Sequence, residues 1–267
     1  MPRISIVTPS YNQAKYLRRT LDSVLSQDVD LEYIIMDACS TDGSVEILQE
    51  YQSVARIVVE KDKGQADAIA KGFAMATGDM LAWLNSDDMY LPGALRHVLA
   101  AYEQGHEFFY GHVCIVDAQD ALLRKRVAIP ASFDDLFYGR YIIPQEATFF
   151  SRRLYEACGG VDPSLQYAMD YDLWLRLALL QRPMRLDRYL SCFRYHLDQK
   201  SSRRPDLYSR EIQLARTKPG TNRPESVLKS SAHRTSLALR KLYSNVAQSG
   251  LRTTLTDLIK KKQGRLP

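Results

Sequence analysis

The sequence predicts an α/β protein with a mixed, mostly parallel sheet flanked by helices, followed by a basic helical C-terminal extension. Two observations predict this fold. Over the first 120 residues, short runs of β-branched residues alternate with segments of helical periodicity, which is the pattern of βαβ units. The charge then changes: residues 1–193 carry 19 Lys and Arg against 26 Asp and Glu, whereas residues 194–267 carry 17 against 5.

The length and composition are those of a globular protein. The chain has 267 residues, of which 45% are hydrophobic and 25% charged, enough to bury a core unaided. Its longest apolar runs, at residues 33–36 and 80–84, are far shorter than the ~20 residues that cross a bilayer. Residues 1–3 lead directly into an apolar run, so we expect no secretion signal and a cytoplasmic location. The four cysteines are scattered, which predicts free thiols.

Five strands are expected in the first half of the chain, each ending at a polar turn. They cover residues 4–8, 32–37, 56–60, 80–85 and 108–117. Between them, apolar residues recur at helical spacing in three groups: Leu17, Leu21, Val24 and Leu25; Ala66, Ile69, Ala70, Phe73 and Ala74; and Leu95, Val98, Leu99 and Tyr102. Asp42 or Ser44 can cap the helix after the second strand, and Pro92 is expected in a first helical turn.

The second half mixes helices with less regular segments. Helices are expected at residues 151–157 and 172–180, with a Gly-Gly break between them. Residues 199–223 are rich in Ser, Arg, Pro and Lys and are expected to form a lid or linker. Residues 226–262 recover a weak amphipathic helical pattern.

Acidic residues gather where the expected strands end. Asp37, Glu60 and Asp62 follow the second and third strands, and Asp87 with Asp88 follows the fourth. Ligands bind outside the carboxyl ends of parallel strands, and converging carboxylates repel one another unless a cation lies between them. Asp87 and Asp88 therefore suggest a Mg²⁺ or Mn²⁺ site. The alternative is that they cap a helix that begins near residue 91.

Four segments, in this order, resemble family 2 glycosyltransferases with the GT-A fold: residues 8–12 (TPSYN), 36–44 (MDACSTDGS), 62–64 (DKG) and 85–88 (NSDD). The resemblance covers roughly residues 3–200. It implies a GT-A-like sheet with a Rossmann-like nucleotide-binding half, a nucleotide-sugar donor, which we expect to be a UDP-sugar, and a role in polysaccharide biosynthesis. The expected organisation is a catalytic domain at 1–200, with a donor half at 1–120 and an acceptor half at 121–200, and a basic extension at 201–267.

The resemblance also implies the residues that bind the donor. Asp87 would face the ribose or the metal, and Asp88 the metal and diphosphate. His196 either ligates the metal or is structural. Asn85 stands where the family often has Asp, which weakens only an outer contact. Further donor-binding residues would be Thr8, Pro9, Tyr11, Asn12, Asp37, Asp62, Lys63 and Lys200, the last together with Arg203 or Arg204 over the diphosphate.

Residues 168–176 resemble the acceptor-side element of the family. Met169 replaces the usual Glu, whereas Asp170 is retained and would be the general base that deprotonates the acceptor hydroxyl. Asp172 is better explained as a helix N-cap. Trp174 is either a sugar platform or a packing residue.

Gln145 and Glu146 precede an apolar run and are expected to line the acceptor pocket, although Glu146 could instead pair with an Arg. Together the motifs predict a metal-dependent, inverting glycosyltransferase, either hexosyl or N-acetylhexosaminyl. One alternative is a sugar nucleotidyltransferase, but residues 9–15 are poor in the Gly that such enzymes place after the first strand. The other is a noncatalytic sugar-binding or anionic-surface-binding module.

The basic extension has two interpretations. Its charge suits a peripheral site on the anionic inner face of a membrane, where a lipid-linked acceptor would be found. It can equally pack on the catalytic domain or mediate self-association. It contains few aromatic residues for base stacking, so nucleic acid is not expected as a partner. The oligomeric state stays open.

Overall fold

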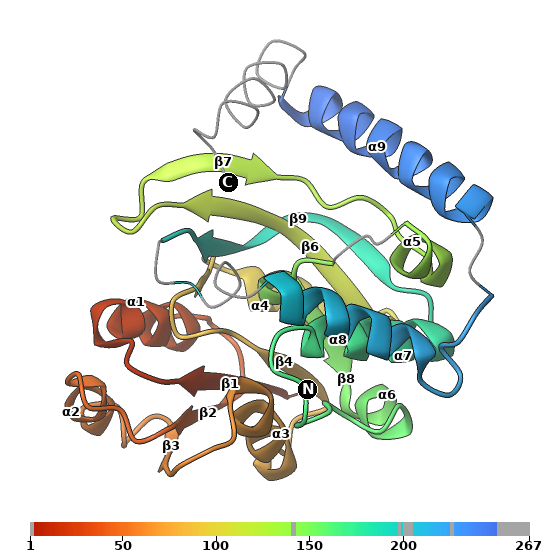
Figure 1. The fold of residues 1–267 in the computed structure, drawn as a ribbon. Coiled ribbons are helices and arrows are strands. Elements are labelled where there is room, and N and C mark those ends of the chain that lie inside the picture. Colours follow the sequence, from red (N-terminus) through yellow and green to blue (C-terminus); the bar gives the residue numbers. More distant parts are fainter. Residues whose placement is uncertain (1–2, 140–142, 197–198, 200–204, 225–226, 250–267) are drawn as a thin grey trace.

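The computed structural model describes residues 3–139, 143–196, 199, 205–224 and 227–249 (Figure 1). Its strands are β1 (Ile4–Ser10), β2 (Leu31–Asp37), β3 (Arg56–Val59), β4 (Met80–Trp83), β5 (Met89–Tyr90), β6 (Phe108–Val116), β7 (Leu122–Arg126), β8 (Thr148–Ser151) and β9 (Met184–Arg194). Its helices are α1 (Ala14–Leu25), α2 (Ser44–Gln49), α3 (Gln65–Met75), α4 (Ala94–Glu103), α5 (Phe133–Phe137), the 3₁₀ turn η1 (Gln145–Ala147), α6 (Arg152–Ala157), α7 (Met169–Leu180), α8 (Pro205–Thr217) and α9 (Val227–Ser249).

The strands form one mixed sheet in the order β3-β2-β1-β4-β8-β6-β9-β5, with β7 paired to β6. β1 to β4 run parallel, and Ile4 of β1 lies opposite Leu31 on one side and Met80 on the other. β8 is antiparallel to both of its neighbours, β4 and β6, whereas β6 and β9 are parallel. The predicted fold class is therefore confirmed, and each of the five expected strands is present within a few residues of its predicted ends.

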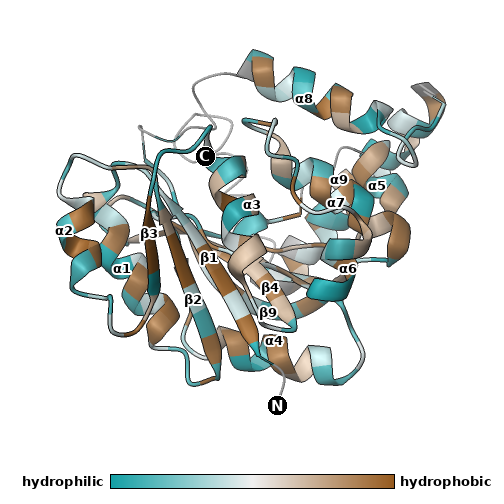
Figure 2. Cartoon of the chain, turned by 90° about the horizontal axis from the view of Figure 1, so that it is seen from below, coloured by the Kyte–Doolittle hydropathy of each residue, from teal (hydrophilic) through white to brown (hydrophobic). Residues whose placement is uncertain are grey.

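Helices cover both faces of the sheet, which explains why β1 and β4 are buried along their whole length (Figure 2). Successive side chains of a strand point to opposite faces. In β1, Ile4 and Ile6 accordingly pack in the core under α1, α2 and α4, whereas Val7 packs in the core under α3 and α7. Both faces of the sheet are thus covered, which leaves the carboxyl ends of its strands for ligands.

Two helices begin at other residues than predicted. α4 starts at Ala94, after Gly93 in the left-handed conformation (φ +73°), so Pro92 precedes the helix and does not lie in its first turn. This helix also begins too late for Asp87 and Asp88 to cap it. α7 starts at Met169, three residues early, so the N-cap prediction for Asp172 is wrong.

The linker predicted at residues 199–223 is wrong for its central part, because residues 205–217 form α8. Its Ile212 and Ala215 are buried in the same core as α7, and Tyr208 packs against this core. These three residues have helical spacing, which the Ser, Arg and Pro content of the segment obscured. The helical pattern predicted for residues 226–262 is confirmed as α9 up to Ser249, and the remainder lies outside the described residues. No helix in the described part of the chain is long and apolar enough to span a membrane.

Candidate active site

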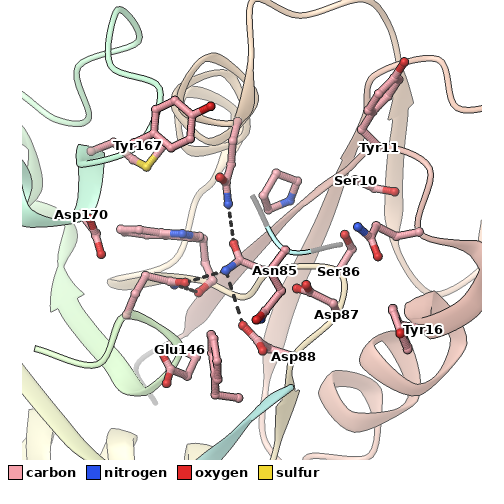
Figure 3. A pocket seen from close by; sticks show the side chains of 18 of the residues that line it. Ser10, Tyr11, Tyr16, Asn85, Ser86, Asp87, Asp88, Glu146, Tyr167 and Asp170 are labelled. Atoms are coloured by element: carbon pink, nitrogen blue, oxygen red, sulfur yellow. Dashed lines mark hydrogen bonds between the residues drawn. The ribbon is translucent and has the colours of Figure 1, made fainter. Parts of the chain in front are cut away.

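A cavity of about 900 Å³ opens at the carboxyl ends of β1 and β4 (Figure 3). Its wall combines the loop after β1, the loop between β4 and β5, η1, and the first turn of α7, which are far apart in the sequence. The structure brings many of the predicted site residues to this cavity: Pro9, Tyr11, Asn12, Asp62, Asp87, Asp88, Gln145, Glu146, Asp170 and His196.

Thr8 and Asp37 lie behind the cavity wall and do not line it. Both side chains are buried, and the Thr8 hydroxyl is 2.9 Å from the hydroxyl of Tyr33. The two carboxylate oxygens of Asp37 accept hydrogen bonds from the backbone N–H (2.8 Å) and the hydroxyl (2.7 Å) of Ser40. These residues support the loops that form the wall.

Two other predicted residues lie away from the cavity, and a third lies outside the described residues. The side chain of Lys63 is exposed and does not line the cavity. Trp174 is completely buried and stacks on Trp83 with ring centroids 5.3 Å apart, so the sugar-platform assignment is wrong and the packing interpretation is right. Lys200, with Arg203 and Arg204, lies outside the described residues.

The loop after β1 presents an exposed aromatic ring at the rim. Asn12 adopts a left-handed conformation (φ 53°), donates its backbone N–H to the Ser40 hydroxyl (2.8 Å) and accepts the Thr41 N–H on its side chain (2.9 Å). These bonds join the loop after β1 to the loop after β2. The preceding Tyr11 is left 62% exposed, with its ring available to a planar ligand.

Asp87 and Asp88 are held by the end of β9, about 100 residues further along the chain. The backbone N–H of Arg194 donates to Asp88 Oδ1 (2.9 Å), and its Nε donates to the Asp87 carbonyl (2.8 Å). Asp87 Oδ2 lies 3.0 Å from His196 Nε2. The Arg194 guanidinium is itself buried and forms an ion pair with Asp120. This role of Arg194 depends on tertiary contacts, so local sequence carries no signal for it.

Asn85 links the two sides of the cavity through a relay of amides. Gln65 Nε2 donates to Asn85 Oδ1 (2.7 Å), and Asn85 Nδ2 donates to Gln145 Oε1 (3.0 Å), as the dashed lines in Figure 3 show. Gln145 Nε2 then donates to the Trp83 carbonyl (2.7 Å). An Asp at position 85 could not donate to Gln145, so the amide has a function here that the motif comparison missed.

The buried carboxyl groups of the cavity have raised pKa values. Burial raises the pKa of Asp88 well above its usual range, and the charges of Asp87 and Glu146 raise it further. Burial also raises the pKa of Glu146, against the opposing charge of Arg126. For Asp170, burial raises the pKa to about 6, although its hydrogen bond from a backbone N–H acts in the opposite direction. The cavity therefore favours the binding of positive charge, and Asp170 can take up a proton near neutral pH.

The side-chain oxygen and nitrogen atoms at the Asp87–Asp88 loop fit a divalent cation whose coordination shell is completed by a bound ligand. Within the described ranges, no three His, Cys, Asp or Glu side chains already form a metal-binding group. Two carboxylates suffice, however, where substrate phosphates and water supply the other oxygens. His196 Nδ1 and Glu146 Oε1 are also buried without a hydrogen-bond partner among the described residues. His196 Nε2 already contacts Asp87, so coordination through that nitrogen would replace this contact.

Comparison with known proteins places the chain in a family. The sequence model described as glycosyl transferase family 2 matches residues 5–157, more than half of the chain. The chain belongs to this family. Family 2 membership makes the chain a glycosyltransferase and sets aside the nucleotidyltransferase and noncatalytic alternatives.

Several curated relatives are glycosyltransferases. An uncharacterized glycosyltransferase of Mycobacterium tuberculosis is 31% identical over 187 residues, which cover 68% of this chain and 71% of the relative. The putative teichuronic acid biosynthesis glycosyltransferase TuaG of Bacillus subtilis is 31% identical over 66% of this chain and 72% of its own length. The chondroitin synthase of Escherichia coli is 28% identical over 67% of this chain. The match spans only 27% of the chondroitin synthase and 38% of a similar Nostoc protein.

Solved structures confirm the GT-A fold. S. aureus TarS 1-349 in complex with UDP-GlcNAc superposes with a TM-score of 0.65 at 16% identity, covering 99% of this chain and 82% of the TarS 1-349 chain. The mannosyltransferase PcManGT of Pyrobaculum calidifontis, in complex with GDP-Man and Mn²⁺, gives 0.60 at 16% identity, covering 98% and 80%. At this identity, the likeness concerns the fold alone.

Proposed function

We propose that this family 2 glycosyltransferase moves a hexosyl or N-acetylhexosaminyl group from a UDP-sugar to a hydroxyl of a glycan or lipid-linked acceptor in polysaccharide biosynthesis. One observation carries the proposal: Asp170, with its raised pKa, lies across a single cavity from the Asp87–Asp88 loop and Tyr11 (Figure 3). The TarS complex with UDP-GlcNAc supports the choice of donor. The name of TuaG, a putative teichuronic acid biosynthesis glycosyltransferase, supports a role in polysaccharide biosynthesis.

In the proposed reaction, Asp170 is the general base. Its carboxylate takes the proton of the acceptor hydroxyl as the hydroxyl oxygen bonds to the anomeric carbon, and the carbon–oxygen bond to the diphosphate breaks. The electron pair of that bond leaves with UDP. Because attack comes from the side opposite the diphosphate, the anomeric configuration inverts. A pKa of about 6 leaves Asp170 ionised at neutral pH but still basic enough to accept the proton.

The donor is proposed to lie along the loop after β1. The exposed ring of Tyr11 offers a face on which the base can stack, while Pro9, Asn12 and Asp62 border the nucleotide. Gln145 and Glu146 face the acceptor side. We propose the corresponding division of the chain into a donor half at 1–120 and an acceptor half at 121–200, with α8 of the 201–267 extension completing the acceptor half.

Asp88 and Asp87 are proposed to hold Mn²⁺ or Mg²⁺ together with the diphosphate, and His196 lies beside them as a further ligand. When bound, this ion stabilises the negative charge that develops on the leaving diphosphate. The raised pKa of Asp88 and the Mn²⁺ complex of PcManGT support this proposal.

A donor screen tests the proposed function. Purified protein is incubated with UDP-glucose, UDP-galactose, UDP-GlcNAc, UDP-GalNAc or GDP-mannose, each with Mn²⁺, Mg²⁺ or EDTA, and nucleotide release is measured by mass spectrometry. We expect UDP release from at least one UDP-sugar, abolished by EDTA. Release from GDP-mannose alone would contradict the proposed UDP-sugar donor. Release that is insensitive to EDTA would contradict the proposed metal ion.

We also propose that α9 rests on an anionic membrane surface, where a lipid-linked acceptor would be found. α9 lies at the outside of the molecule (Figure 1), attached through the buried Leu237. Its opposite side carries Leu228, Leu239, Leu242 and Tyr243, all exposed. Residues 227–267 contain nine Lys or Arg and one Asp, so the charge suits anionic headgroups, at about 1 kcal/mol for each basic residue near the surface.

Vesicle sedimentation of the full chain tests this surface. We expect binding to phosphatidylglycerol vesicles but not to phosphatidylcholine vesicles, and loss of binding in Leu239→Ser/Leu242→Ser. The matched control is Leu214→Ser, which changes an exposed leucine of α8. If the α9 variant instead dissociates a dimer in analytical ultracentrifugation, a second copy of the chain covers this face and the membrane proposal fails.

A further inference from the structure

α8 reaches across to the loop that precedes α7 through one side chain, Glu211. Its Oε1 accepts the backbone N–H of Gln166 (2.8 Å), and its Oε2 accepts those of Tyr167 (2.7 Å) and Ala168 (2.8 Å). The three bonds span 43 to 45 residues of sequence. A single carboxylate therefore fixes three consecutive peptide units.

These peptide units lie at a point that needs such a partner. The N–H of Ala168, the N-cap residue of α7, has no acceptor within the helix, and residues 166 and 167 precede the helix and lie outside its hydrogen-bond ladder. Charge-assisted hydrogen bonds to a carboxylate are roughly twice as strong as neutral ones, and negative charge is favoured at a helix N-terminus. Glu211, which comes from a distant helix, thus binds the peptide units that lead into α7.

A second contact keeps α8 in place beside α7. Lys218, just after α8, lies 2.6 Å from Asp172 Oδ1 and 2.8 Å from Asp162 Oδ2. Asp172 is fully buried in the first turn of α7 and also pairs with Arg176. The extension therefore holds the chain on both sides of the proposed base. Glu211 binds residues 166–168 before Asp170, and Lys218 binds Asp172 after it.

The loop held by Glu211 also contacts the donor side. Gln166 Nε2 donates to the Lys63 carbonyl (3.0 Å), and both Gln166 and Tyr167 line the cavity. Gly64 permits this approach, because a Cβ there would lie 2.5 Å from Gln166 Oε1. A shift of the loop would consequently change the distance between the Asp170 carboxylate and the donor.

We propose that Glu211 is a positioning residue: it holds loop 166–168 so that the Asp170 carboxylate faces the anomeric carbon at attack distance. The inference rests on the proposed role of Asp170 as base. A misplacement of about 1 Å costs on the order of a hundredfold in rate, so the effect falls on turnover. Binding of UDP, which depends on the loops after β1 and β4, stays unchanged.

The experiment compares Glu211→Ala and Glu211→Gln with a matched control, Glu103→Gln, which makes the same change on the exposed end of α4. The readouts are amide hydrogen exchange of residues 166–171, UDP release from UDP-GlcNAc with Mn²⁺, UDP affinity, and the melting temperature. For Glu211→Ala we expect at least tenfold faster exchange in the loop, about 10- to 100-fold lower kcat, and UDP affinity within twofold of the unaltered enzyme. Glu211→Gln, which keeps an acceptor oxygen, should recover part of kcat.

Three results would overturn the inference. Unchanged exchange of the loop would show that Glu211 does not hold it. Faster exchange with unchanged kcat would show that the loop does not position the base. A loss of kcat matched by an equal loss of UDP affinity would indicate a general structural role. If the unaltered enzyme releases no UDP, the donor proposal fails, and the exchange result alone decides whether Glu211 holds the loop.

Discussion

On the proposed donor side of the cavity, two carboxylates are held by close sequence neighbours, whereas the loop before Asp170 on the proposed acceptor side is held by a residue far along the chain. Asp62 accepts the N–H of Gly64, two residues on, and Asp37 is bound by Ser40, three residues on. In contrast, the loop before Asp170 is fixed by Glu211, more than 40 residues away. The proposed donor side thus combines local turns at strand ends with the long-range contacts of Asp87 and Asp88 to Arg194, whereas the loop before Asp170 is held by helix packing.

Buried carboxyl groups lie on both proposed sides. Burial raises the pKa of Asp88 in the acidic loop, and it also raises the pKa of Glu146 and Asp170 across the cavity. Carboxyl groups with raised pKa values take up protons near neutrality, which suits general base catalysis. The comparison predicts that substitutions on the acceptor side change turnover, and that those on the donor side change the binding of nucleotide and metal.

The largest effect is expected from Asp170→Asn. The amide keeps the volume of the side chain but cannot take a proton, so kcat should fall by about 10²- to 10⁴-fold. The measurement is the initial rate of UDP release at saturating UDP-sugar and Mn²⁺. A fall of less than tenfold would show that another group is the base.

Trp174→Ala should lower the free energy of unfolding by roughly 3–5 kcal/mol, because it empties a large site in the core beneath the acceptor side. Chemical denaturation measures this change, and Trp174→Phe should cost much less. If stability were unaffected while the KM for acceptor rose, Trp174 would be a sugar platform after all.

The strand ends and the acidic loop between β4 and β5 could be predicted from sequence, because short apolar runs stop at Asp37 and before Asp87. The packing of Trp174 and the contacts of Arg194 and Glu211 could not. Each depends on partners brought together only by the tertiary fold. Asn85 was recognised as a departure from the family motif, but its bonds to distant amides were beyond prediction.

The pH dependence of turnover should follow the ionisation of the Asp170 carboxyl group. Its pKa is raised to about 6 and its ionised form is the active base, so kcat should fall below pH 6 by up to tenfold per pH unit and be nearly level above pH 7. The profile is measured as UDP release at saturating donor, with circular dichroism to confirm folding at each pH. An acidic limb near pH 4 would place the catalytic carboxylate in a solvated environment instead.

The smallest effect is expected from Asn85→Ala, at the boundary between the two sides. It removes the hydrogen bonds to Gln65 and Gln145, each worth about 1 kcal/mol, so the rate of UDP release should fall by at most about 30-fold. A loss as large as that of Asp170→Asn would place Asn85 in the chemistry itself.

The division between the two sides is tested most directly by calorimetric titration of UDP in the presence of Mn²⁺ into Asp88→Asn, Asp170→Asn and the unaltered enzyme. Asp88→Asn removes an anionic ligand from the donor side, whereas Asp170→Asn leaves that side intact. We predict that Mn²⁺-dependent UDP binding is lost in Asp88→Asn and within twofold of the unaltered enzyme in Asp170→Asn. Equal affinities in all three proteins, or loss only in Asp170→Asn, would contradict the account.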